Sequence, residues 1–337
     1  MNLKMIAKRA GVSAVTVSNV INGKHHKVSR ETIERVQQII RETGYQPNAT
    51  ARSLIKKQSR IIGVVIPHVE RDQPASLSPY NSQMMALLEC EIRQRGYYQM
   101  SCCVPRCKDA VPSIATWNVD GAVILGAFED DVEELHKLLN IPAVYLDAYL
   151  HARSVHTVCV DDEQGGYLAA RHLIERGHRS IAFVAPAYTA ESVICHRYRG
   201  FVRAFQERNL PLPEDHYFTA DTLFESGIAA GRMIAEKENT FTGIVTAADV
   251  VAFGVIEGLR ACGKRVPEDV SVIGFDDIPA CRYTYPQLTT VSQHMEEKAR
   301  RAVELLFSLI EPDEPGPDSR TVPVELIERG TVRRIRE

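Results

Sequence analysis

Apolar residues near the start of the chain recur at the three- and four-residue spacing of amphipathic helices. The pattern predicts one helix over residues 3–10, which Gly11 ends, and a second that begins after the N-cap residue Ser13. A third helix is expected between Ser29 and Gly44. Two short helices joined by a glycine-containing turn are typical of a helix-turn-helix. The positions expected to face inward are Leu3, Ile6, Ala7, Ala10, Val17, Val20, Ile21, Ile33, Val36 and Ile40.

From residue 61 onward, apolar runs alternate with helical segments. Strands are predicted over residues 61–67, 122–125, 181–184, 243–246 and 270–275. Helices are predicted between them, for example over 165–176 and 254–261. Alternating strands and helices favour an α/β fold in which parallel sheets are covered by helices on both faces. The units are too many for one sheet, so two similar halves are expected behind the all-α head.

The segment between these two regions is broken by proline. Pro47 restricts the residue before it, and the short stretch 49–54 is rich in helix formers but too short to be stable alone. We therefore predict a helix-turn-helix domain over 1–46, a hinge helix and linker over 47–60, and a core over 61–337. A marginal helix in this place is suited to coupling the two domains, because it forms only when something holds it.

Charge is distributed unevenly along the chain. Residues 1–60 contain 12 lysines and arginines against three acidic residues, whereas the whole chain carries a formal net charge of −3. The head is therefore basic and the remainder acidic. Binding of DNA phosphates with release of counterions is the simplest use for such a head. The alternative is a basic face that is merely solvated.

Composition places the chain among ordinary soluble proteins. It has 337 residues, of which 45% are hydrophobic and 25% charged, which is typical of a globular protein with two or three domains. No run of about 18 apolar residues occurs, and no signal peptide begins the chain. We therefore expect a cytoplasmic protein without a membrane partner.

The eight cysteines form no regular framework. Cys102, Cys103 and Cys107 lie close together, but no Cys-x-x-Cys pair and no histidine at a zinc-finger spacing accompanies them. We expect reduced, mostly buried thiols and no metal site, with a metal or thiol-sensor role as the alternative.

Motifs typical of enzymes are missing from the sequence. No Gly-x-Gly-x-x-Gly follows the first strand, and no Gly-x-Ser-x-Gly elbow, P-loop or His-Glu-x-x-His occurs. We therefore expect neither an enzyme nor a cofactor. Two alternatives stay open: a hydrolase that uses scattered carboxylates, and a sugar-binding transport component, which would need an export signal.

Aspartates follow three of the expected strands directly. Asp147, Asp161 and Asp276 each come after an apolar run, and ligands of open α/β sheets bind beyond the carboxyl ends of the strands. Such carboxylates suit polyhydroxylated or amine-bearing ligands, although each one is equally suited to a helix cap or a loop. Asp249, which follows Ala248, is predicted to cap its own helix.

Several short stretches of the head match one known family. They are Ile6-Ala7, Ala10-Gly11-Val12-Ser13, Thr16-Val17-Ser18, Asn22-Gly23, Gly44-Tyr45, Pro47-Asn48 and Ala51-Arg52-Ser53-Leu54. With them, residues 2–56 resemble the DNA-binding head and hinge of the LacI/GalR family of bacterial transcription regulators, and the match continues through most of the chain. The resemblance implies a core with the type I periplasmic-binding-protein fold, which the chain crosses three times. Its N-subdomain would contain about 61–160 and 293–321, and its C-subdomain about 161–292 and 322–337.

The resemblance also implies how the head would bind DNA. Two chains would pair as a homodimer on a pseudo-palindromic, double-stranded operator. Leu54 from each hinge would wedge into the minor groove, the alternative being that Leu54 packs on its own core. Base-reading residues are expected at Ala14, Val15, Thr16, Asn19 and Leu54, although Thr16, like Asn22, is better suited to a phosphate. Backbone contacts are expected from Ser13, Asn22, Asn48 and Arg52.

In the family, residues at the positions of Arg197 and Asp276 contact a small effector between the subdomains. The full expected effector set is Tyr80, Asp147, Asp161, Ser192, Arg197, Thr222 and Asp276. Departures from the family pattern at Asn81, Thr222 and Ala248 leave the effector's identity open. We predict a repressor controlled by a sugar or sugar derivative, with a nucleobase or nucleoside as the alternative. Whether the effector is an inducer or a corepressor stays open.

Overall fold

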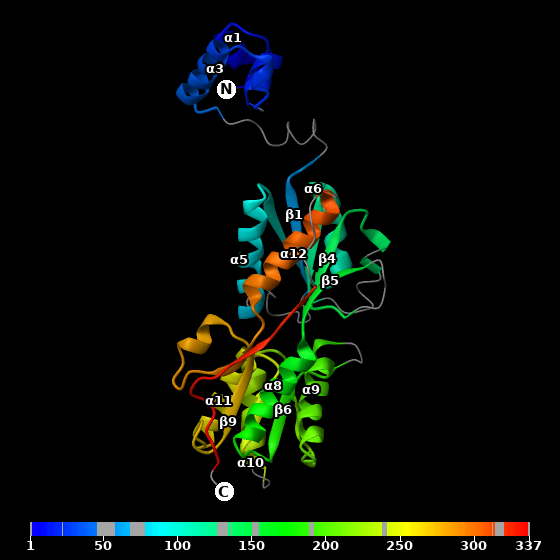
Figure 1. Ribbon diagram of the computed structural model, residues 1–337, viewed down its shortest axis with the longest axis vertical. Helices are drawn as coiled ribbons and strands as arrows, with labels where there is room; N and C mark the ends of the chain where they lie inside the picture. Colours follow the sequence, from blue (N-terminus) through cyan, green and yellow to red (C-terminus); the bar gives the residue numbers. More distant parts are fainter. Residues whose placement is uncertain are drawn as a thin grey trace. The chain divides into compact units, whose positions relative to one another are not determined.

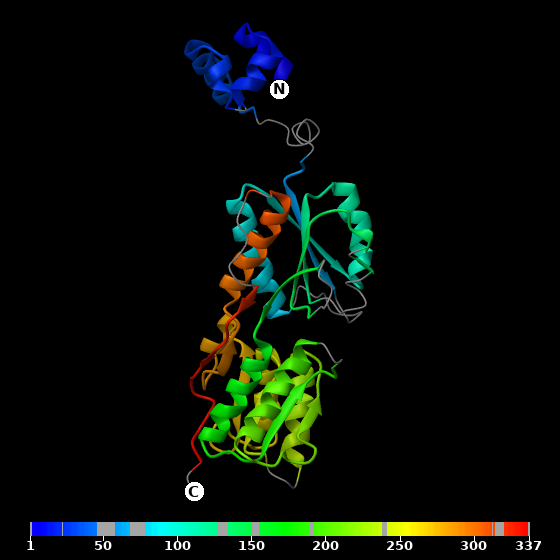
Figure 2. The same cartoon turned by 45° about the vertical axis from the view of Figure 1, so that its right-hand side comes forward.

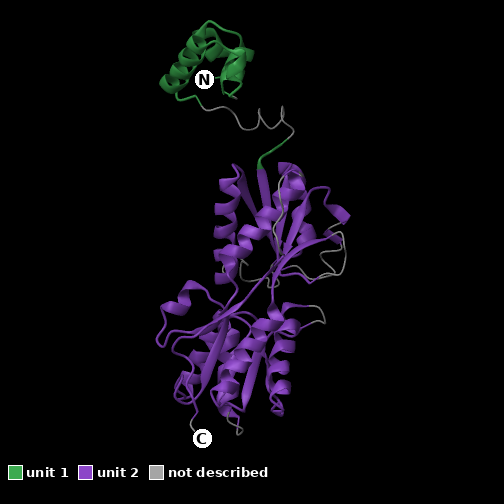
Figure 3. Cartoon of the chain, viewed as in Figure 1, with its two compact units in different colours: residues 1–60 green, residues 61–337 purple. Residues whose placement is uncertain are grey.

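The computed structural model of the protein describes residues 2–21, 23–45, 58–67, 78–126, 134–135, 137–149, 155–188, 192–237, 241–311, 313 and 320–335. The chain divides into two compact units, a head over residues 1–60 and a core over residues 61–337 (Figure 3).

The head contains three α-helices with a single 3-10 turn between the second and third in its described part. They are α1 (Leu3–Ala10), α2 (Ala14–Ile21), η1 (His25–Lys27) and α3 (Arg30–Thr43), and the three α-helices lie where the sequence predicts them. Ser13 Oγ accepts a hydrogen bond from the Thr16 backbone N–H at 3.0 Å, so it caps α2 as expected. Gly11 and Gly44 end α1 and α3 in the left-handed conformation that favours glycine.

The helices of the head enclose a small apolar core. Its buried residues are Ile6, Ala7, Ala10, Val17, Val20, Val36 and Ile39. On α3, Val36 is buried and Ile33 and Ile40 pack against the core as predicted, and Ile39 is a further buried residue that the prediction left out. Ala14 packs partly against this core, whereas Val15 is 68% exposed. Val15 is therefore an exposed apolar residue on α2.

In the part of the core that the structure describes, the strands form two six-stranded sheets. The first, with strand order β11-β5-β4-β3-β1-β2, is parallel throughout; it contains β1 (Ile61–Pro67), β2 (Tyr98–Val104), β3 (Gly121–Leu125), β4 (Ala143–Leu146), β5 (His156–Val160) and β11 (Thr321–Val322). The second has the order β12-β10-β9-β8-β6-β7, and β12 is its antiparallel strand. It contains β6 (Ile181–Ala185), β7 (Tyr217–Thr219), β8 (Gly243–Thr246), β9 (Ser271–Asp276), β10 (Thr289–Ser292) and β12 (Glu325–Ile327).

Helices cover both faces of each sheet, as the alternating pattern predicts. On the first sheet, α5 (Pro79–Gln94) and α12 (Met295–Ile310) lie side by side on one face (Figures 1 and 2), and η3 (Cys107–Ala110) and α6 (Val111–Trp117) pack on the other. On the second sheet, α8 (Asp162–Glu175) and α9 (Val193–Glu207) cover one face. The opposite face is covered by α10 (Phe224–Glu236) and α11 (Asp249–Ala261), and η4 (Pro279–Arg282) follows β9.

The chain passes between the two sheets three times, as the family resemblance implies. The connections run from β5 to α8, from β10 to α12, and from β11 to β12. Residues at these connections and at nearby strand ends come from distant parts of the sequence. The junction of the sheets is therefore where a site could be built from both halves.

Several elements differ from the prediction. Helices α8 and α11 begin at Asp162 and Asp249, three and five residues before the predicted starts. Strand β2 was not predicted, because it forms the edge of its sheet and consists of exposed and half-buried residues. Within the part of the chain that the structure describes, no helix combines the length and the apolar character that a membrane crossing requires.

Helices α8 and α9 approach each other unusually closely. A Cβ atom placed on Gly166 would lie 1.8 Å from the Arg197 carbonyl oxygen, and one on Gly200 would lie 1.8 Å from the Glu163 carbonyl oxygen. Both contacts are with backbone, which cannot rotate away as a side chain can. The two glycines therefore set the separation of the helices and, with it, the position of Arg197.

We expect Gly200→Ala to lower the free energy of unfolding by about 2–3 kcal/mol, since the added methyl group forces α8 and α9 apart. Urea unfolding of the purified protein measures the loss. Gln206→Ala, at an exposed position of the same helix, is the control and should change stability by less than about 0.5 kcal/mol. Equal effects of the two substitutions would contradict the close contact.

Candidate functional site

A buried lysine lies at the centre of the polar groups near the junction of the sheets. Lys298 on α12 is fully buried. Its Nζ donates hydrogen bonds to Tyr80 Oη at 2.9 Å and to Gln293 Oε1 at 2.8 Å, and it forms an ion pair with Asp147. Tyr80 in turn donates to Asp147 Oδ2 at 2.6 Å. Two residues of the predicted effector set, Tyr80 and Asp147, are thus held together by a lysine that sequence analysis did not single out.

The same hydrogen-bonded group reaches the second sheet through Gln293. Its Nε2 donates to Asp276 Oδ1 at 2.5 Å, and Asp276 ends strand β9. Asp276 is 94% buried by residue area, with a φ of 127° in the region that side chains rarely adopt. A continuous group of contacts therefore links Asp147, which follows β4, with Asp276, the last residue of β9.

Burial changes the protonation of this group. Desolvation, reinforced by the neighbouring Asp249 carboxylate, raises the pKa of Asp276 to about 8, although Arg197, Gln293 and Lys298 oppose the shift. Burial therefore favours the protonated form of Asp276 over a wider pH range than for an exposed aspartate. Burial and the adjacent Asp147 carboxylate also raise the pKa of Tyr80 well above its usual value, so its hydroxyl stays a donor.

Arg197 is held from three sides by the second half of the core. Its Nε donates to Asp162 Oδ1 at 2.7 Å and its Nη1 to the Ala247 carbonyl oxygen at 2.6 Å. The guanidinium carbon lies 3.7 Å from the centroid of the Phe275 ring, a cation–π contact. Burial alone would lower the pKa of Arg197, but the carboxylates of Asp162 and Asp276 outweigh burial, and the pKa is raised.

Asp162 is a site residue that sequence analysis missed. Besides Arg197, it accepts a hydrogen bond from Tyr149 Oη at 2.8 Å, and the Tyr149 ring stacks on His196 at 3.9 Å. Asp161, which we predicted, is exposed and caps α8 by accepting from the Gln164 backbone N–H at 2.9 Å. The pair Asp161-Asp162 in the sequence could have identified this residue. One aspartate is enough to cap the start of a helix, so the second is free to face inward.

The other predicted effector residues lie outside these two groups of contacts, as far as the described residues reveal them. Ser192 caps α9 by accepting from the Cys195 backbone N–H at 3.2 Å. Thr222 is exposed just before α10. Arg197 and Asp276 are therefore the two predicted residues that combine burial, charge and a place at the junction.

The prediction that Asp249 caps its helix is wrong. Ala248 occupies the N-cap position, and Asp249 is fully buried. Its Oδ2 accepts from the Ile278 backbone N–H and from Cys281 Sγ, both at 3.0 Å, and its Oδ1 accepts from Thr290 Oγ1 at 2.5 Å. As the first residue inside α11, it faces the sheet and ties down the segment that follows Asp276.

The cysteines are all free, and half of them are buried. Cys107, Cys159, Cys195 and Cys281 lie in the interior, Cys102 is half-buried, and Cys90, Cys103 and Cys262 are exposed. The expectation that most would be buried is therefore met only in part.

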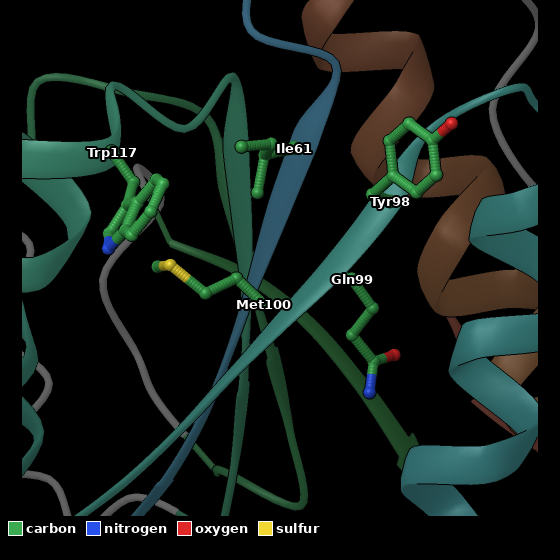
Figure 4. Close-up of a pocket in the computed structure, with 5 residues that line it drawn as sticks. All are labelled: Ile61, Tyr98, Gln99, Met100 and Trp117. Carbon is green, nitrogen blue, oxygen red and sulfur yellow. The ribbon is translucent and has the colours of Figure 1, made fainter. Parts of the chain in front are cut away.

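One surface pocket of about 290 Å³ lies away from these residues (Figure 4). It is lined by Ile61, Tyr98, Gln99, Met100 and Trp117, at the start of β1 and β2. In Figure 4, Met100 extends toward Trp117. None of the predicted effector residues lines this pocket, and its mainly apolar walls offer no charged group.

The predicted DNA-reading residues on α2 are partly engaged within the head. Thr16 Oγ1 lies 2.9 Å from Ser13 Oγ, so one of these hydroxyls donates to the other. Asn19 is half-buried, and Val15 is the most exposed of the predicted base-reading residues on α2. The predicted contacts of Asn22, Asn48, Arg52 and Leu54 lie outside the described residues.

We expect Asp276→Asn to alter how stability depends on pH. An unfolded aspartate ionises near pH 4, whereas Asp276 in the folded protein ionises near pH 8. The folded state therefore binds an extra proton between these values, and the wild type should lose stability relative to the variant as the pH rises from 5 to 8. The difference in free energy of unfolding between the two proteins should change by at most about 1.4 kcal/mol per pH unit. Urea unfolding at each pH measures this difference.

Asp269→Asn serves as the control. The side-chain hydrogen bond from exposed Arg265 holds the pKa of Asp269 below its usual value, so its ionisation lies outside this pH range. Its effect on stability should be constant from pH 5 to 8. Parallel stability curves for the wild type and Asp276→Asn would contradict the assignment.

Comparisons with known proteins agree with this architecture. Residues 2–48 match the bacterial regulatory proteins of the lacI family, and residues 170–332 match the periplasmic binding protein-like domain. The chain is 33% identical to the HTH-type transcriptional repressor PurR of Yersinia pestis bv. Antiqua (strain Antiqua), over 98% of this chain and 96% of that protein.

Among solved structures, the chain is similar to the lac repressor dimer bound to operator and the anti-inducer ONPF, with 27% identity and a TM-score of 0.84 over 99% of each chain. It is also similar to a CelR–cellobiose complex, with 28% identity and a TM-score of 0.73 over 98% of this chain and 99% of that one. A ribose-bound LacI family regulator from Enterococcus faecium is 27% identical, with a TM-score of 0.70 over 82% of this chain and all of that one. The chain therefore belongs to the LacI family of DNA-binding transcriptional regulators.

Proposed function

We propose that this regulator represses transcription as a homodimer on a pseudo-palindromic operator, and that a sugar or sugar derivative at the junction of the two sheets controls its affinity for DNA. It acts in the cytoplasm and has no enzymatic activity. The observation that carries the proposal is the pair of buried groups, Arg197 and Asp276, at a junction that both halves of the core build.

The chemistry of these two residues suits hydroxyl groups. Arg197 offers guanidinium N–H donors, and Asp276 has one oxygen beyond the one that Gln293 engages. A ring with several hydroxyls accepts from the first and exchanges hydrogen bonds with the second, since a hydroxyl both donates and accepts. The related solved structures with cellobiose and with ribose support a carbohydrate. A nucleobase or nucleoside remains the rival, because its ring nitrogens and carbonyls pair with the same groups.

The proposal includes the rest of the predicted effector set. Tyr80 and Asp147 stand beside Asp276 through Lys298 and Gln293. The contributions of Asp161, Ser192 and Thr222 rest on the family resemblance.

For DNA, we propose that α2 enters the major groove. Val15 contacts a thymine methyl group, Asn19 reads an adenine edge, and Ala14 and Thr16 complete the base-reading surface. Ser13, Asn22, Asn48 and Arg52 hold the backbone, and Leu54 is the minor-groove wedge. The division into a head over 1–46, a hinge and linker over 47–60 and a core over 61–337 is part of the same proposal, since the hinge would couple the two sites.

A thermal-shift screen of neutral sugars and nucleobases, followed by operator binding with each hit, tests the sensing function. We expect a sugar to raise the melting temperature and to change operator affinity at least about tenfold, in line with typical coupling between sites. Arg197→Lys should abolish the shift, because lysine keeps the charge but loses the two-sided hydrogen bonding. Arg199→Lys, exposed on the same helix, is the matched control. A ligand that binds without changing operator affinity would refute the proposal.

Asn19→Ala should relax the preference at one base pair per half-site by about 1–3 kcal/mol, since alanine cannot pair with a base edge. Binding to a panel of operators with single base changes measures this effect. Gln38→Ala on the surface of α3 should leave base preference unchanged. If the base preference of Asn19→Ala equals that of the wild type, Asn19 does not read the operator.

A further inference from the structure

Lys298 lies on the buried face of α12, where the other buried residues are apolar. The buried residues of α12 are Met295, Lys298, Ala299, Ala302, Val303, Leu305, Leu306 and Phe307, and Lys298 is the charged one among them. A buried ammonium group costs several kcal/mol unless nearby groups compensate its charge and its hydrogen bonds. Its partners therefore indicate what the lysine does.

The hydrogen-bonding capacity of Lys298 is used completely within the protein. An ammonium group has three N–H donors, and three acceptors surround it: Tyr80 Oη, Gln293 Oε1 and Asp147 Oδ1. No donor remains for a bound ligand. Lys298 is therefore a positioning residue and does not itself recognise the effector.

The same contacts occupy Asp147. Its Oδ1 pairs with Lys298, and its Oδ2 accepts from Tyr80 at 2.6 Å. The carboxylate is thus neutralised by a cation of the chain itself and hydrogen-bonded on both oxygens. A carboxylate at a strand end would otherwise attract an amine-bearing ligand, which is one of the two ligand classes that the sequence leaves open.

Lys298 also fixes the orientation of Gln293. Because Gln293 Oε1 faces the ammonium, its Nε2 must face Asp276, to which it donates at 2.5 Å. This leaves the second oxygen of Asp276 for a ligand. Lys298 thereby occupies Asp147 and Gln293 Oε1 and leaves one oxygen of Asp276 available to a ligand.

We propose that Lys298 acts as a tethered cation, which fills the place that an effector's amine would take at Asp147, so that the effector is an uncharged polyhydroxylated compound recognised through Arg197 and Asp276. The part of this inference that concerns the effector rests on the proposed sensing function. The cation-binding character of Asp147 is independent of that function and can be tested separately.

Chemical rescue tests the tethered cation directly. Lys298→Ala removes the equivalent of a propylammonium ion and leaves Asp147 unpaired. We expect the variant to be less stable than the wild type, and propylammonium chloride to raise its melting temperature by about 2–4 °C more than sodium chloride or propanol does. In Lys298→Ala/Asp147→Asn the cavity remains but the anion is gone, so propylammonium should have no such effect.

The exposed ion pair between Lys237 and Asp215 provides a matched control. Propylammonium should not rescue Lys237→Ala, because that carboxylate stays hydrated. If Lys298→Ala does not fold without the amine, the yield of refolded protein with propylammonium, compared with sodium chloride, gives the same information. Failure of propylammonium to stabilise or refold Lys298→Ala would overturn the inference.

A second arm compares glucose with glucosamine and galactose with galactosamine by thermal shift. In the wild type neither amino sugar should bind as tightly as its neutral parent, and Lys298→Ala should move the ratio at least about tenfold toward the amine. An amino sugar that binds the wild type as tightly as its parent would overturn the inference. If propylammonium rescues Lys298→Ala but no sugar or nucleobase binds the wild type, the tethered cation stands and the proposed sensing function fails.

Discussion

The core depends on the neutralisation of two buried cations at the junction of its sheets. Arg197 is paired with Asp162 on the second half, and Lys298 with Asp147 on the first. Each cation would destabilise the fold if its partner were lost, since an unpaired buried charge is far more costly than an exposed one. Gln293 connects the two sides because it contacts both Lys298 and Asp276. Polar contacts of the chain itself therefore hold the junction together where an apolar interface would need no compensating charges.

Sequence patterns predicted the architecture well where local rules decide it. The three helices of the head follow from apolar spacing and from caps such as Ser13 and Gly44. The buried strands β1, β3, β6, β8 and β9 follow from runs of apolar residues, since both of their faces are covered. The edge strand β2 was not predicted, because its exposed positions are not apolar throughout and the sequence therefore lacks a continuous apolar run there.

The site was predicted less completely, because its geometry depends on contacts between distant residues. Arg197 and Asp276 were identified from strand ends and family resemblance, but a single aspartate has many uses. Asp161 caps a helix while Asp162 binds Arg197, and Asp249 supports a loop instead of its own helix. Lys298 was overlooked because it sits among the apolar residues of α12, where only the position of Asp147, 151 residues earlier in the chain, explains a charge.

Strand β2 has a consequence for how the protein behaves in solution. It is the outer strand of the first sheet, and its sequence from Tyr98 to Val104 contains neither a charged residue nor a proline. Natural proteins ordinarily guard such edges with those residues, because unpaired backbone groups recruit strands from other molecules. If no other segment or molecule packs over β2, its free edge can pair with strands of other molecules. Such pairing would lower the solubility of the protein.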